Sequence, residues 1–96
     1  MEYLVTMTTH VPDGTPDQAV DDVRAREAAH SRELAAAGHL LRLWRLPGGS
    51  RALGLWTARD LAEMQTILKS LPMDPWMAVE TTPLTRHPSD PAATIS

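Results

Sequence analysis

The chain has 96 residues, a formal net charge of −3 and a hydrophobic fraction of 43%, which suits one small domain folded around a single core. Its nine basic residues are interspersed with twelve acidic ones, so the composition excludes the clustered basic surface of a nucleic-acid-binding domain. The complete lack of cysteine excludes disulfides, thiolate catalysis and cysteine-based metal sites.

Nothing in the sequence indicates export or insertion into a membrane. The first eight residues lack a basic segment followed by a long apolar one, which a signal peptide would show. No stretch approaches the roughly 20 apolar residues of a transmembrane helix. We therefore expect a cytoplasmic protein without a membrane partner.

The first half of the chain predicts a strand and a long helix. Residues 1–9 are rich in Tyr, Val and Thr, and the side chains of Tyr3, Val5 and Met7 alternate with those of Leu4, Thr6 and Thr8. This pattern predicts a strand buried on at least one face. After a loop at 10–14, the pair Thr15–Pro16 predicts a helix start, with the threonine as N-cap and the proline as first helical residue. The helix should end at Gly38, which suits a left-handed C-cap.

The second half predicts two strands, a helix and a last strand. In order, these are strands at 39–46 and 51–56 joined by a hairpin at 47–50, a helix at about 58–70, a rigid proline-containing loop at 71–76 and a strand at 77–84. Strict alternation in the first of these strands would place Leu41, Leu43 and Arg45 on one face and Leu40, Arg42 and Trp44 on the other.

The element order is β-α-β-β-α-β, which predicts an α+β, ferredoxin-like fold with a four-stranded antiparallel sheet and both helices on one face. Residues 1–88 would form this domain, and 89–96 a proline-rich tail. The strands carry apolar residues on both faces, but the helices cover only one. We therefore expect a homodimer, or a larger ring of dimers, that covers the second face.

Glu27 is the strongest candidate for a functional residue. Helical spacing places it near the middle of the core-facing side of the first helix, with Arg24 one turn before it and Ser31 one turn after. Burying a carboxylate there is costly unless it is paired, protonated or functional. It could form an ion pair with Arg24, Arg42 or Arg45, or it could be a general base whose pKa an apolar pocket raises. Spacing alone leaves both interpretations open.

The remaining candidates carry weaker signals. His30 flanks the same side of the helix as Glu27, but the four histidines show no metal-ligand spacing, so we predict no metal. Trp44 and Arg45 are neighbours in a strand, so only one of them can face the helices. Trp76, in the rigid loop, suits packing as well as stacking against a ligand.

Four blocks of the sequence, taken together, resemble a known family. They occur in the same order and at nearly the same spacing as in muconolactone Δ-isomerases, and they extend to Pro88. The blocks are Arg24-Ala-Arg-Glu-Ala-Ala-His-Ser-Arg-Glu-Leu34, Gly38 followed by Leu43-Trp44-Arg45, Leu71-Pro72-x-x-Pro75-Trp76-Met77, and Thr82-Pro83-Leu84-x-x-His87-Pro88.

The resemblance implies a ferredoxin-like fold, dimers within larger rings, no cofactor and a pocket near the subunit interface. It also implies an isomerase that takes muconolactone to 3-oxoadipate enol-lactone by proton transfer. Glu27 would act as base and acid, with His30 as a second catalytic residue. The residues expected to bind substrate are Arg24, Ser31, Trp44, Arg45 and Trp76.

Three positions depart from the family pattern and leave two alternatives open. His30 stands where the family typically has tyrosine, Asp74 replaces an apolar residue, and Trp76 replaces a tyrosine. One alternative is a tailoring isomerase or cyclase for a polyketide-like substrate in secondary metabolism. The other is a dimeric small-molecule binding module without catalysis. A small cavity lined by arginine would favour the lactone acid, and a long apolar cavity would favour a polycyclic substrate.

Overall fold

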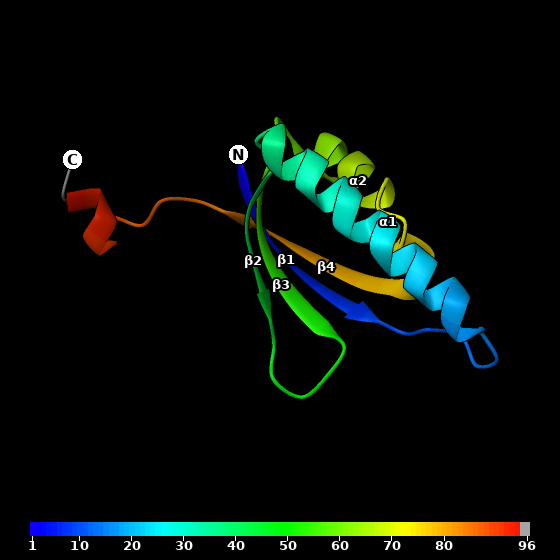
Figure 1. Ribbon diagram of the computed structural model, residues 1–96. Helices are drawn as coiled ribbons and strands as arrows, with labels where there is room; N and C mark the ends of the chain where they lie inside the picture. The colour runs from blue at the N-terminus through cyan, green and yellow to red at the C-terminus, as the bar shows by residue number, and fades with distance from the viewer. Residues whose placement is uncertain (95–96) are drawn as a thin grey trace.

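The computed structural model describes residues 1–94 and shows a four-stranded antiparallel sheet with two helices (Figure 1). Its elements are β1 (Glu2–Thr9), α1 (Asp17–Ala36), β2 (Leu40–Arg45), β3 (Arg51–Thr57), α2 (Leu61–Lys69), the 3₁₀ turn η1 (Asp74–Trp76), β4 (Met77–Leu84) and the 3₁₀ turn η2 (Pro91–Thr94). The strand order is β2-β3-β1-β4, so β1 and β3 are central. This confirms the predicted ferredoxin-like α+β fold.

Both helices lie on the same face of the sheet and enclose the core (Figure 1). Alternation in β1 sends Tyr3, Val5 and Met7 toward the helices, where all three are buried. Burial of such side chains is the main favourable contribution to folding a domain of this size. The other buried core residues are Leu34, Trp56, Ala58, Met64, Leu68 and Leu71.

The two ends of α1 differ in how well the sequence predicted them. The predicted Thr15 N-cap is wrong: the residue before the helix is Pro16, and no side chain caps the helix there. The Thr15 hydroxyl instead donates to the Pro12 carbonyl at 2.6 Å, so it closes the preceding turn. Gly38 is confirmed, with a φ of 88° and its amide bonded to the Ala35 carbonyl, as in a glycine-ended helix.

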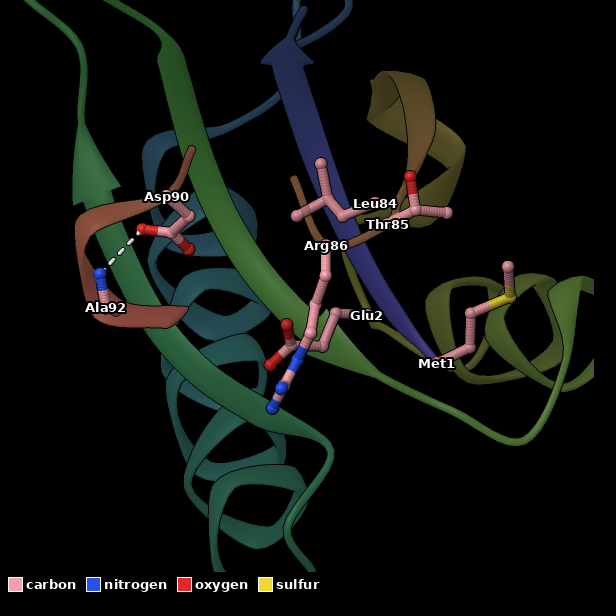
Figure 2. Close-up of a pocket in the computed structure, with 7 residues that line it drawn as sticks. All are labelled: Met1, Glu2, Leu84, Thr85, Arg86, Asp90 and Ala92. Carbon is pink, nitrogen blue, oxygen red and sulfur yellow. Dashed lines mark hydrogen bonds between the residues drawn. The ribbon is translucent and has the colours of Figure 1, made fainter. Parts of the chain in front are cut away.

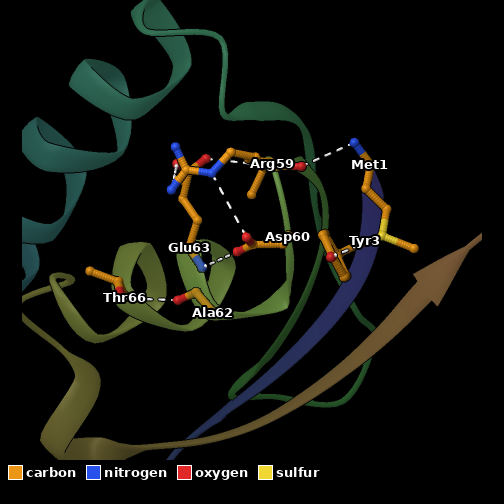
Figure 3. Close-up of polar contacts among 8 residues, drawn as sticks. Met1, Tyr3, Arg59, Asp60, Ala62, Glu63 and Thr66 are labelled. Atoms are coloured by element: carbon orange, nitrogen blue, oxygen red, sulfur yellow. Dashed lines mark hydrogen bonds and ion pairs between the residues drawn. The ribbon is translucent and has the colours of Figure 1, made fainter.

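The second helix begins at Leu61, three residues after the predicted Ala58. Asp60 is the N-cap, and its carboxylate accepts a 2.9 Å hydrogen bond from the Glu63 amide. Glu63 in turn accepts from the Arg59 amide at 3.0 Å, so the two acidic side chains satisfy free amides at both sides of the helix start (Figure 3). This reciprocal cap explains the later start.

A β-bulge interrupts the predicted alternation of β2. Leu40 pairs with Trp56 of β3, but the next pair is Arg42 with Leu55, so Leu41 is an extra residue. The predicted strict alternation is therefore wrong. After the bulge, Leu43 and Arg45 share the helix-side face with Leu40, whereas Arg42 and Trp44 face the opposite side.

The second sheet face carries no helix in the described part of the chain (Figure 1). Pairing places Leu4, Leu53 and Leu55 on this open face, beside Trp44, whose side chain is 39% exposed. After β4 the chain runs away from the sheet toward η2 (Figure 1). The domain boundary at Pro88 stays a prediction, and the last two residues of the predicted tail lie outside the described residues.

Candidate active site

Glu27 lies on the side of α1 that faces the core and is half-buried. Its Oε1 atom accepts a 2.9 Å hydrogen bond from the backbone amide of Met73, in the loop between α2 and η1. The amide is not committed to helix or strand, so it is free to donate to a side chain. The bond joins two segments that are 46 residues apart.

Burial raises the pKa of Glu27 above its usual value of 4.5. Asp74 raises this pKa further by charge repulsion, while the Met73 amide and the charge of His30 act in the opposite direction. Desolvation is the largest of these effects, because a half-buried carboxylate loses water that would stabilise its charge. A carboxylate with a raised pKa is a stronger base once ionised, which suits proton abstraction near neutral pH.

The alternative in which Glu27 forms an ion pair finds no support in the described residues. Among residues 1–94, the ion pairs within 4.0 Å join His30 to Glu33 and Arg59 to Asp60 and Glu63, and none includes Glu27. Arg42, one of the partners considered, lies over the ring of Trp44 at 5.0 Å, on the open face. The Met73 amide is thus the polar partner of the carboxylate.

A cavity of about 350 Å³ opens beside Met73, at the end of the sheet where β1 ends. Three arginines line it: Arg24 from α1, Arg45 from β2 and Arg51 from β3. Within residues 1–94, none of the three forms an ion pair, and no carboxylate lines the cavity. The other lining residues are Thr9, Gly49, Ser50, Ala52 and Met73. Arg45 lies on the side of the sheet that α1 covers, so the unpaired guanidinium groups of Arg24 and Arg45 suit a small anion.

Met73 connects this cavity to Glu27. Its side chain is 8% exposed and lines the cavity, and its amide donates to the Glu27 carboxylate. Arg24, one turn before Glu27 on α1, is a second connection. Glu27 does not itself line the cavity, but both residues that connect it to the cavity, Arg24 and Met73, do.

The structure separates the other predicted site residues. His30 lies one turn after Glu27, with its Nε2 atom 2.8 Å from the Ser70 hydroxyl oxygen. Ser31 is half-buried on α1, and Trp76 is half-buried in η1, where its carbonyl accepts from the His10 amide. Trp44 lies on the open sheet face, so the structure does not bring it together with Glu27 within one chain.

Two groups of the site were missed in the sequence. The Met73 amide is a backbone group, and no side-chain pattern announces it. The sequence position of Arg51 could have indicated it, because Arg45 precedes the hairpin and Arg51 follows it. Across the hairpin, the Leu46 amide donates to the Arg51 carbonyl at 3.0 Å. The register nevertheless places the two side chains on opposite faces: Arg45 lies opposite Ala52 on the helix side, and Arg51 lies opposite Thr8 on the open face.

A larger cavity lies elsewhere. It measures about 670 Å³ and lies between the beginning of β1 and the segment after β4 (Figure 2). Its lining residues are Met1, Glu2, Leu84, Thr85, Arg86, Asp90 and Ala92. Because β1 runs from Glu2 to Thr9, this cavity lies at the opposite end of the strand from the arginine-lined one. It holds none of the predicted site residues.

In residues 1–94 no three His, Asp or Glu side chains are grouped as metal ligands. Neither helix in this part of the chain has the length and hydrophobicity needed to span a bilayer.

The sequence matches relatives over nearly its whole length. Residues 1–90 match the family model of muconolactone delta-isomerase. The chain is 37% identical over 89 residues to muconolactone Delta-isomerase 1 of Acinetobacter lwoffii, covering 93% of each chain. It is 35% identical to muconolactone Delta-isomerase of Cupriavidus pinatubonensis, covering 93% of this chain and 97% of the relative.

Solved structures agree with this assignment. A crystal structure of muconolactone isomerase superposes with a TM-score of 0.87 at 26% identity, covering 95% of both chains. A 5-chloro-2-hydroxyhydroquinone dehydrochlorinase from Burkholderia phenoliruptrix shares the fold alone, with a TM-score of 0.67 at 13% identity. Sequence and structure together show that the chain belongs to the muconolactone Δ-isomerase family.

Proposed function

We propose that this chain is a cofactor-independent isomerase that moves a C=C bond in an unsaturated lactone bearing a carboxylate, muconolactone or a close analogue. One observation carries the proposal: Met73 lines a cavity that Arg24 and Arg45 also line, and it donates its amide to the half-buried carboxylate of Glu27. A base and an anion site thus share one residue. The names of the curated relatives support the reaction type.

The chemistry requires one proton to move between two carbons of the substrate. Glu27 would remove the acidic proton from the ring carbon that bears the side chain, and the electrons would pass to the lactone carbonyl as a dienolate. The protonated Glu27 would then return the proton to the carbon next to that carbonyl, two positions away. The carboxylate ends the cycle as it began, so no other reactant is needed.

The arginine-lined cavity supports a carboxylate-bearing lactone as the substrate. Arginine binds carboxylates with two parallel hydrogen bonds, and Arg24 and Arg45 line the cavity. Its volume of about 350 Å³ is at the small end of ligand pockets, which measure roughly 300–1,000 Å³. These features favour a small acid over the polycyclic substrate of a tailoring isomerase or cyclase.

Isomerisation of the lactone tests the proposal directly. The full chain, mixed with muconolactone, should convert it to the isomer whose C=C bond ends at the ring carbon bearing the side chain, as followed by ¹H NMR. E27Q should lower the rate at least about 100-fold, because general acid–base catalysis contributes roughly 10²–10⁴-fold. D22N is the matched control, since Asp22 is an exposed carboxylate on the same helix, and it should keep the wild-type rate.

Two results would contradict the proposal. Isomerisation by E27Q at the wild-type rate would remove Glu27 from the mechanism. Tight binding of the lactone by the wild-type chain without any isomerisation would instead identify a binding module.

We further propose that the chain works in the cytoplasm as a homodimer, which can assemble into a larger ring. Leu4, Leu53 and Leu55 form an apolar strip on the open sheet face beside Trp44, and contact with a second copy would remove this surface from water. The lack of cysteine fits a compartment where thiols stay reduced and disulfides are rare.

A further inference from the structure

One turn of α1 holds the chain after α2 at two points. Glu27 accepts from the Met73 amide at 2.9 Å, and His30 Nε2 lies 2.8 Å from the Ser70 hydroxyl oxygen. Glu27 and His30 are three residues apart on α1, and Ser70 and Met73 are three residues apart in the segment after α2. Because Glu27 pairs with Met73 and His30 with Ser70, the two segments run in opposite directions. The segment 70–73 therefore cannot shift along α1 without breaking both contacts.

The hydrogen bonds around Ser70 determine which nitrogen of His30 carries the proton. The Ser70 hydroxyl donates its only proton to the Ile67 carbonyl at 2.5 Å. It must therefore accept from His30, so the Nε2 atom of the imidazole is the donor. The Nδ1 atom faces the Glu33 carboxylate at 3.7 Å. A second proton would bind at Nδ1, so the contact with Ser70 persists in both charge states of the ring.

We propose that His30 is a positioning residue: by donating to Ser70 it fixes segment 70–73, and thereby keeps the Met73 amide aimed at the Glu27 carboxylate. The catalytic part of this inference rests on the proposed function. The contact itself does not, because it exists in the chain without substrate. His30 thus has a role that does not require it to reach the reacting atoms.

The groups around Glu27 predict what loss of this contact would do. Three groups act on its charge: the Met73 amide, His30 on the same helix and Asp74 of η1. The amide lowers the pKa of Glu27, because it stabilises the ionised form. A displaced segment 70–73 would weaken that hydrogen bond, so the pKa of Glu27 should rise further.

NMR of the ligand-free chain tests the positioning role. In S70A the imidazole of His30 remains, but the hydroxyl that accepts from it is gone. We therefore expect a carboxyl titration to give a higher pKa of Glu27 than in wild type. The backbone amide of Met73 should exchange its hydrogen about tenfold faster. H30A should show both changes. H30Q should keep the wild-type exchange rate, since its side-chain amide can donate to Ser70.

T66A is the matched control for S70A. The Thr66 hydroxyl donates to the Ala62 carbonyl at 3.0 Å, as the Ser70 hydroxyl donates to the Ile67 carbonyl, but within residues 1–94 it forms no hydrogen bond with α1. T66A should therefore leave Glu27 and Met73 unchanged. Unchanged titration and exchange in both S70A and H30A would overturn the proposal.

Kinetics provide the second test. S70A and H30A should lower kcat several-fold with KM nearly unchanged. In both variants the acidic limb of the pH profile of kcat/KM should move to higher pH, by as much as the pKa of Glu27 rises in the NMR titration. The double variant should be no worse than H30A, because both changes break one contact. A loss of activity in H30A with a fully active S70A would identify His30 as a direct proton donor and overturn the positioning role. An inactive wild type would contradict only the proposed function, because the NMR comparison would still decide the positioning role.

Discussion

The Oε1 atom of Glu27 and the backbone amide of Met73 lie 2.9 Å apart, and this hydrogen bond links the long helix to the loop that follows α2. Without it, a half-buried carboxylate would lack a partner, which is costly in a protein interior. One amide does not compensate for the lost water, so the pKa of Glu27 stays raised. The folded protein therefore retains a base whose ionised form destabilises it.

The stability of the protein should reveal this cost. A carboxyl group with a raised pKa stabilises the fold at low pH, and this contribution is lost as the pH rises through the folded-state pKa. E27Q is neutral at every pH and keeps an oxygen that can accept from Met73. We expect E27Q to have a higher Tm than wild type at pH 8, and the difference to shrink toward pH 4. Thermal unfolding followed by circular dichroism measures this.

The control for that experiment is D22N, whose Tm difference from wild type should not grow with pH in this way. Asp22 is exposed, so its charge keeps its water. A lower Tm of E27Q at pH 8 would show that the ionised carboxylate stabilises the fold.

Arg45 should contribute to substrate binding, because it lies on the helix side of the sheet and lines the cavity. Removing one hydrogen bond to a charged group costs about 1.5–3 kcal/mol, so R45A should raise KM for the lactone acid roughly 10–100-fold, and kcat should change less. R59A is the control, because Arg59 pairs with Asp60 and Glu63 at the start of α2 (Figure 3) and does not line the cavity. Steady-state kinetics should show an unchanged KM for R59A. Equal effects of the two substitutions would exclude a specific role of Arg45.

The open sheet face should control the oligomeric state. W44E and L53E each place a charge on the proposed interface, and desolvating an unpaired charge there is unfavourable. Light scattering coupled to size exclusion should show a dimer or larger assembly for wild type and a smaller mass for both variants. L61E is the control, because Leu61 is 46% exposed on α2, away from that face. A monomeric wild type would contradict the proposed interface.

Two glycines should respond differently to the same substitution. A methyl group at Gly54 would overlap the Nε1 atom of Trp56, a buried group without a hydrogen-bond partner in residues 1–94. G54A should therefore cost about 1–3 kcal/mol, as overpacked cores do, and should change Trp fluorescence. G38A meets no atom within 4 Å, so only its left-handed backbone should matter, at roughly 1–2 kcal/mol, without a spectral change. Urea denaturation followed by fluorescence measures both.

The fold was predictable because its signals are local. Alternation in β1 and the glycine after α1 each reflect a preference of the residues themselves, and both predictions are confirmed. The errors occur where several residues compete for one role. Thr15 donates its hydroxyl to the Pro12 carbonyl and does not cap α1. Asp60 caps α2, so this helix begins later than the sequence predicted.

The candidate site was only partly predictable. The position of Glu27 on the core side of α1 followed from helical spacing, and Arg24 and Arg45 line the cavity beside it. The amide of Met73 and the hydroxyl of Ser70 came close to α1 only through tertiary packing, which no spacing along the chain encodes. Residues 46 positions apart in sequence meet because the loop after α2 folds back over the long helix.

The extra residue in β2 has a consequence for how this chain can change by insertion or deletion. Arg45 lines the cavity and Trp44 lies on the open sheet face because the bulge at Leu41 reverses the alternation after Leu40. Deletion of Leu41 would remove the bulge and leave Arg42 opposite Leu55, so Trp44 and Arg45 would keep these surfaces. Insertion of one residue between Arg42 and Leu43 would instead exchange the two side chains between those surfaces. One such insertion in this edge strand would alter the ligand cavity and the surface for a second copy at once, whereas loss of the extra residue would alter neither.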